Sequence, residues 1–177
     1  KICRSKNNES YIAVKKIYSK YKNLLEDEIK REIYLALHNY LYVYKDGVIN
    51  ESNMKEIYSI QSNMIDDKIY EDNNGFIIPN LFFDHVVILI DLKKYKEAEI
   101  FINENRDGLI IKNKDDYLNY LGGRIHICNN EYEKAIPLFS KINKKDRELY
   151  LLSKIYELLC HYEIGFKKDI DDMTNSI

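Results

Sequence analysis

The chain has 177 residues, of which 45% are hydrophobic, and this size and composition suit one domain with a substantial buried core. A formal net charge of −2 argues against nucleic acid or an anionic membrane as the partner, and no apolar run approaches the roughly 20 residues that span a bilayer. Cys3, Cys128 and Cys160 are an odd number without disulfide or metal-ligand spacing, so we expect a reducing, cytoplasmic location.

The first predicted elements are two helices. Apolar spacing predicts a helix over about residues 10–22, and a second helix is expected over about residues 26–44, ended by Asp46-Gly47. The side chains expected to face inward from the first helix are Ile12, Ala13, Ile17 and Tyr21. Two prolines and six glycines leave little room for the turns of an all-β protein, which favours an all-α fold.

The middle of the chain predicts three further helices. Asn50 or Ser52 is expected to cap the first of them, which ends at residues 72–75. Pro79 suits the first turn of the next helix, over about residues 80–92, because its missing amide hydrogen would be unpaired there. A tight turn at Lys93-Lys94-Tyr95 then leads into a helix over about residues 96–105.

Two more helix hairpins are expected in the last third. One pairs residues 114–128 with residues 131–142 around an Asn129-Asn130 turn, and Gly123 should face Ala135 where its two helices cross closely. The other begins at Asp146, carries Leu149, Leu152, Tyr156 and Leu159, and turns near residues 162–165.

Tyr132, Ala135 and Phe139 follow the Asn129-Asn130 turn in the same register as Tyr95, Ala98 and Ile102 follow theirs. This pattern resembles tetratricopeptide-like repeats. The resemblance implies a single helical-repeat domain over residues 1–177. Its expected fold is all-α, a right-handed α-α superhelix of antiparallel helix hairpins. The hairpins are expected at about residues 10–45, 51–105, 114–142 and 146–177. One repeat cannot bury its apolar face alone, so stacked repeats are expected to share one core. We expect the chain to be a fragment of a longer array, because it begins at Lys1 without methionine and stops where a closing helix would be starting.

Residues 70–165 also resemble an uncharacterised family of Bacteroidetes proteins that carry such repeats. The strings that carry this resemblance are 70–82, 95–104 and 151–159. They encode turns and packing positions, so the likeness implies fold and no particular activity.

The sequence contains no Gly-rich phosphate loop, His-Glu-x-x-His pair, Gly-x-Ser-x-Gly elbow or calcium-loop spacing. We therefore expect a protein that is not an enzyme and holds no cofactor or metal. The alternative is a metal site in which His85 and His126 approach each other and Asp84 is the third ligand. The favoured interpretation is that these histidines are half-buried, hydrogen-bonded helix residues.

Mapped onto the repeats, the first-helix positions that line a concave face carry rings and cations: Phe83, Tyr117, Tyr120, Arg124, Arg147, Tyr150 and Lys154. We expect a noncatalytic scaffold that binds a protein or peptide segment there, with rings for affinity and cations that orient carboxylates. Two alternatives stay open. These side chains could pack between repeats, or the chain could be the peptide-sensing part of a regulator whose N-terminal DNA-binding region lies outside this sequence.

Overall fold

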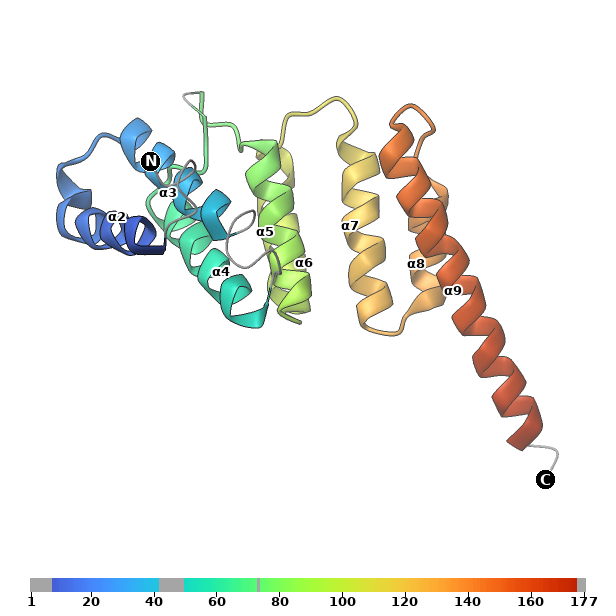
Figure 1. The fold of residues 1–177 in the computed structure, drawn as a ribbon. Coiled ribbons are helices and arrows are strands. Elements are labelled where there is room, and N and C mark those ends of the chain that lie inside the picture. The colour runs from blue at the N-terminus through green and yellow to red at the C-terminus, as the bar shows by residue number, and fades with distance from the viewer. Residues whose placement is uncertain (1–7, 42–49, 73, 175–177) are drawn as a thin grey trace. The chain divides into compact units, whose positions relative to one another are not determined.

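The computed structural model describes residues 8–41, 50–72 and 74–174. Within these ranges the protein has eight α-helices and no β-strand, apart from an isolated antiparallel bridge between Glu71 and Ile77. The prediction of an all-α fold is confirmed. The chain divides into two compact units, residues 1–92 and 93–177, and within each unit the helices that are neighbours in the sequence pack on one another (Figure 1).

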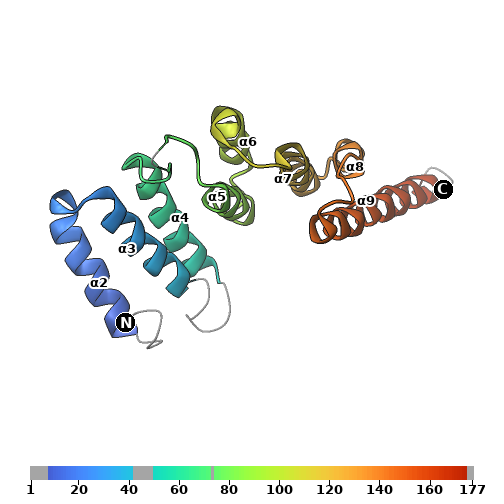
Figure 2. The same cartoon turned by 90° about the horizontal axis from the view of Figure 1, so that it is seen from above.

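The first unit contains four α-helices: α2 (Asn8–Tyr21), α3 (Asp27–Asn39), α4 (Glu51–Asp66) and α5 (Pro79–Asp91). A 3-10 turn, Lys22–Leu24, joins α2 to α3, and Figure 2 shows α2, α3 and α4 side by side. The core between these helices is mostly apolar, with Leu37, Ile57, Met64, Phe82 and Leu89 buried in it. These helices correspond to predicted ones, but α4 ends at Asp66, before the predicted end at residues 72–75, and Lys68 with a φ of 56° turns the chain there.

Local sequence signals set the starts of α4 and α5. The side chain of Asn50 accepts a hydrogen bond of 2.9 Å from the Asn53 amide, so Asn50 rather than Ser52 caps α4. Pro79 is the first residue of α5, as predicted. The Asp46-Gly47 helix end predicted for the preceding helix lies outside the described residues.

The predicted inward face of the first helix is wrong. Tyr11 and Tyr18 are buried in α2, whereas Ile12 and Ile17 are 56% and 59% exposed. Both tyrosines have aromatic partners on the same unit: the Tyr11 ring stacks on Tyr40 at 4.7 Å, and Tyr18 meets Tyr34 edge to face. These large rings bury more area than isoleucine would, and ring pairing adds to the gain, so α2 turns its tyrosines inward.

The second unit contains α6 (Tyr95–Asn105), α7 (Lys114–Cys128), α8 (Tyr132–Ser140) and α9 (Arg147–Thr174), with a 3-10 turn at Arg106–Gly108. The bounds of α7 and α8 agree with the predicted hairpin. The core cluster of the second unit consists of Ala135, Phe139, Ile142, Leu149 and Cys160. Figure 1 shows α9 continuing past the ends of α7 and α8.

The close crossing in the α7–α8 hairpin involves a different partner from the one predicted. A Cβ atom added to Gly123 would lie 2.5 Å from Cζ of Phe139, and all three nearest heavy atoms belong to that ring. Gly123 therefore makes room for Phe139 rather than facing Ala135. Ala135 is itself fully buried in the same cluster.

The turn predicted near residues 162–165 is absent, because α9 is one helix of 28 residues that runs through this segment. Gly165 lies inside the helix with nothing within 4 Å of a Cβ position. A single helical glycine costs only about 1 kcal/mol relative to alanine, which is too little to end a helix with favourable neighbours. Leu152 and Leu159, two of the apolar residues that predicted this helix, are 37% and 39% exposed.

Candidate functional site

The residues predicted to bind a partner fall in both units. Phe83 belongs to α5 of the first unit, where it is half-buried and its ring meets Phe82 edge to face at 5.4 Å. The other six belong to α7 and α9 of the second unit.

Tyr117 and Tyr120 connect α7 to the elements that follow it. The Tyr117 hydroxyl donates a hydrogen bond of 2.9 Å to Oδ2 of Asp146, which raises the pKa of this tyrosine. The Tyr120 ring lies 6.3 Å from that of Phe139 and 5.9 Å from that of Tyr156, and burial raises its pKa. Both side chains are thus engaged in packing within the unit, which is the alternative that the sequence left open for them.

The first turns of α9 bring three of the predicted residues onto neighbouring positions. Arg147 is exposed, and the half-buried Tyr150 ring has the ammonium of Lys154 5.5 Å from its centroid. Lys154 also pairs with Glu157 at 2.5 Å. Arg124, from α7, is half-buried, and its positive charge lowers the pKa of Tyr120 against the larger effect of burial.

A row of large apolar side chains is exposed along α9. The row, called here the α9 stripe, consists of Leu151, Leu152, Ile155, Leu158, Leu159 and Tyr162, which are between 37% and 72% exposed. Spacings of three, four and seven residues place them on one face, opposite the buried Leu149, Ser153 and Cys160. Contiguous apolar patches of this kind mark interaction sites, because covering them removes apolar area from water.

Charged side chains border the α9 stripe. Arg147, Lys154 and His161 recur every seven residues along one side of it and form what we call the basic edge. Glu163 lies on the other side, and Glu148 lies in the first helical turn, where a carboxylate complements the helix dipole. The surface therefore combines an apolar centre with a border of mostly positive charge on one side.

A cleft in the first unit is a second candidate. It has a volume of about 590 Å³ and lies between α2, α3 and α4, over the buried side chains of Tyr18 and Ile60. Three lysines line it, and each pairs with a carboxylate: Lys15 with Glu56, Lys22 with Asp67 and Lys55 with Glu51. Because these cations are already compensated, the cleft offers little selectivity for an anionic ligand.

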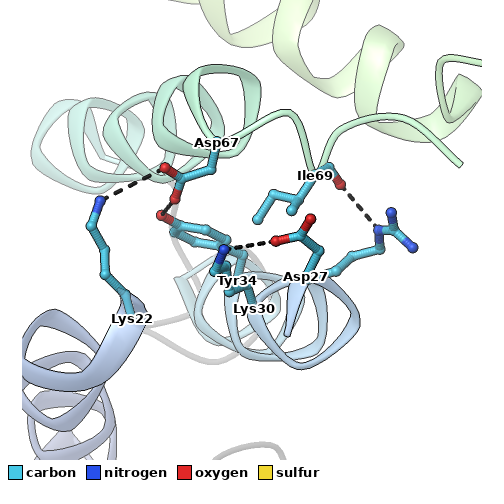
Figure 3. A network of polar contacts seen from close by, with 7 residues as sticks. Lys22, Asp27, Lys30, Tyr34, Asp67 and Ile69 are labelled. Atoms are coloured by element: carbon cyan, nitrogen blue, oxygen red, sulfur yellow. Dashed lines mark hydrogen bonds and ion pairs between the residues drawn. The ribbon is translucent and has the colours of Figure 1, made fainter. Parts of the chain in front are cut away.

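Polar contacts beside this cleft serve the fold. Figure 3 shows Asp67 receiving a hydrogen bond of 3.2 Å from the Tyr34 hydroxyl while Lys22 lies 3.8 Å away. Nearby, Arg31 donates to the backbone carbonyls of Ile69 and Glu71. Burial raises the pKa of Tyr34. The hydrogen bonds from Tyr34 and Arg31 hold the segment between α4 and α5 against α3.

The histidines considered as metal ligands have hydrogen-bond partners. His85 is buried and contacts Oε1 of Gln61 at 3.1 Å, and the same amide reaches His38 at 3.3 Å. His126 lies 2.7 Å from a Glu131 carboxylate oxygen. Burial raises the pKa of Asp84. Across the described part of the chain, no three His, Cys, Asp or Glu side chains group as metal ligands would.

The described helices include none with the length and apolarity needed to cross a bilayer. Comparisons of the chain with protein-family models, with curated proteins and with solved structures found no match.

Proposed function

We propose that the chain is a noncatalytic protein-interaction module of the helical-repeat type and that α9 carries its main contact surface. The single observation behind this proposal is the α9 stripe, in which six large apolar side chains are exposed along one helix face. Helices packed in sequence order support the helical-repeat part of the proposal. The right-handed, tetratricopeptide-like superhelix remains part of the proposal on the strength of the repeated Tyr-Ala-aromatic positions.

A protein partner fits the α9 stripe better than a small molecule does. Small ligands bind in concave pockets that bury most of their surface, whereas the outer face of a helix is convex. Protein interfaces instead join a central group of large apolar and aromatic residues to a polar rim. Arg147 and Tyr150 supply residue types that often dominate binding energy at such interfaces.

The test compares two double variants that carry the same kind of change on different helices. Ile155→Glu/Leu158→Glu places charges in the α9 stripe, and Ile12→Glu/Ile17→Glu places them at two exposed positions of α2. Each tagged protein is used to capture partners from cells that make the native protein, and captured proteins are quantified by mass spectrometry. Unchanged thermal unfolding shows that both variants are folded.

We expect a set of proteins that the wild type and the α2 variant capture equally and that the α9 variant loses. Retention of that set by the α9 variant would contradict the placement of the surface. If the wild type captures nothing beyond an unrelated helical protein used as background, the module itself is the wrong proposal.

A further inference from the structure

We infer that the α9 stripe docks an amphipathic helix with acidic side chains along its edge. This inference rests on the proposed function and goes further by naming the chemistry of the partner. It follows from two properties of α9: the spacing of its exposed apolar residues and the position of its charges relative to them.

The spacing is that of a helix-pairing seam. Leu151, Ile155, Leu158 and Tyr162 alternate intervals of four and three residues, which is the a and d pattern of a coiled coil. These residues span about 16 Å along the helix at about 1.5 Å per residue, or three turns. Leu152 and Leu159 follow at the neighbouring e positions and widen the seam on that side. A partner helix can cover all of it with one apolar face.

The charges decide which helix fits. In this register the basic edge, Arg147, Lys154 and His161, occupies every g position along the seam. Residues at g meet g in an antiparallel helix pair and e in a parallel pair, and charges there select the partner and its direction.

A second copy of α9 matches this edge poorly in either direction. An antiparallel copy would set one basic edge against the other, so Arg147 and Lys154 would face basic side chains and no carboxylate. A parallel copy would set the basic edge against Leu152 and Leu159, which offer no carboxylate. A partner with Asp or Glu at the facing positions satisfies the edge and keeps the apolar seam.

The three basic residues do not contribute equally. Lys154 already pairs with Glu157, which also accepts a hydrogen bond from Ser140, so part of its charge is compensated. Arg147 is exposed and can form a bidentate pair with a carboxylate. We therefore expect Arg147 to carry most of the preference for an acidic edge.

The experiment uses two synthetic peptides, each about three heptads long with the same leucine seam. One has glutamate at all its e and g positions, and the other has lysine there. Fluorescence anisotropy measures their binding to the wild type, to Ile155→Glu/Leu158→Glu and to Arg147→Glu/Lys154→Glu. Sedimentation velocity measures whether the chain alone self-associates.

We expect the glutamate peptide to bind the wild type at least about fivefold more tightly than the lysine peptide at low salt, with a smaller difference at high salt. The Arg147→Glu/Lys154→Glu variant should reverse the preference, and Ile155→Glu/Leu158→Glu should bind neither peptide. Equal affinities, or no binding of either peptide by the wild type, would overturn the inference. So would self-association that Ile155→Glu/Leu158→Glu abolishes, because a second copy would then occupy the stripe.

The capture experiment separates the two proposals. If neither peptide binds the wild type but Ile155→Glu/Leu158→Glu still loses captured proteins, the proposed interaction surface is supported and only the acidic-helix partner is contradicted. If capture is also unaffected by that variant, the proposed function falls with it.

Discussion

Two glycine-to-alanine substitutions should have different effects on stability, because one glycine faces a ring and the other faces open space. In α7, a Cβ atom at Gly123 would lie 2.5 to 2.9 Å from three atoms of the Phe139 ring. That ring is fully buried and stacks on Tyr156 at 5.7 Å, so it cannot move without disturbing its neighbours. In α9, a Cβ atom at Gly165 meets nothing within 4 Å.

Both substitutions gain about 1 kcal/mol of helix preference, so this contribution cancels when the two variants are compared. Overpacking a well-filled core typically costs about 1–3 kcal/mol. Gly165→Ala should therefore be more stable than the wild type by about 0.5–1 kcal/mol. Gly123→Ala should be less stable than Gly165→Ala by about 1–3 kcal/mol.

Urea unfolding followed by circular dichroism measures both free energies of unfolding. A Gly123→Ala protein that matches Gly165→Ala in stability would refute the packing of Phe139 on Gly123. A second measurement isolates the contact: combining Gly123→Ala with Phe139→Leu should cost less than the two single changes added together, because the smaller side chain leaves room for the new methyl group.

Three further predictions test other parts of the structure. Tyr18→Ala should lower the free energy of unfolding by about 3 kcal/mol or more, whereas Ile17→Glu should change it by no more than about 0.5 kcal/mol. Equal effects of the two variants in urea unfolding would contradict the assignment of Tyr18 to the buried face of α2. Hydrogen bonds from backbone amides lower the pKa of Asp72, so its contribution to stability should be complete above pH about 4 and disappear as the pH falls through its folded-state pKa. Asp72→Asn should therefore reduce the fall in melting temperature at acid pH. An unchanged fall would contradict the assigned role of Asp72. Ile155→Glu/Leu158→Glu should melt within a few degrees of the wild type because both side chains are largely exposed, and a collapse in stability would show that the α9 stripe is covered.

The sequence predicts best where the deciding interactions are local. Lys93 and Asn130 both adopt positive φ, and both lie in the tight turns expected from the pattern of the flanking helices. Asn50 and Pro79 act within a single helical turn, so their roles at the starts of α4 and α5 can be predicted without knowing the rest of the fold.

The inward face of α2 depends on distant partners. Tyr11 gains a hydrogen bond to Glu56, 45 residues away, as well as its ring contact with Tyr40. Ile12, next to Tyr11, is also apolar, so the hydrophobic periodicity alone does not show which of the two faces of α2 is buried. Tertiary contacts decide between the two faces, and these are not visible in one sequence.

The sequence predicts Arg147 and Lys154 of the basic edge, but it does not predict the apolar α9 stripe beside them, for a related reason. The spacing of Leu151, Ile155 and Leu158 indicates an apolar helix face, but it does not distinguish a face covered by the core from one left exposed. The predicted turn near residues 162–165 also divides into two shorter helices what the structure shows as one helix, α9. Tyr117 and Tyr120 were recognised as candidates, yet their partners on other elements engage them in packing.

Site-specific photocrosslinking tests the central claim most directly. A benzophenone amino acid placed at Leu158, in the middle of the α9 stripe, reports what lies against that face in cells that make the native protein, and the same probe at the exposed Ile17 of α2 is the control. The account predicts discrete crosslinked protein adducts at position 158 that are missing at position 17. An absence of adducts at position 158, or the same adducts at both positions, would contradict the claim that α9 is the interaction surface.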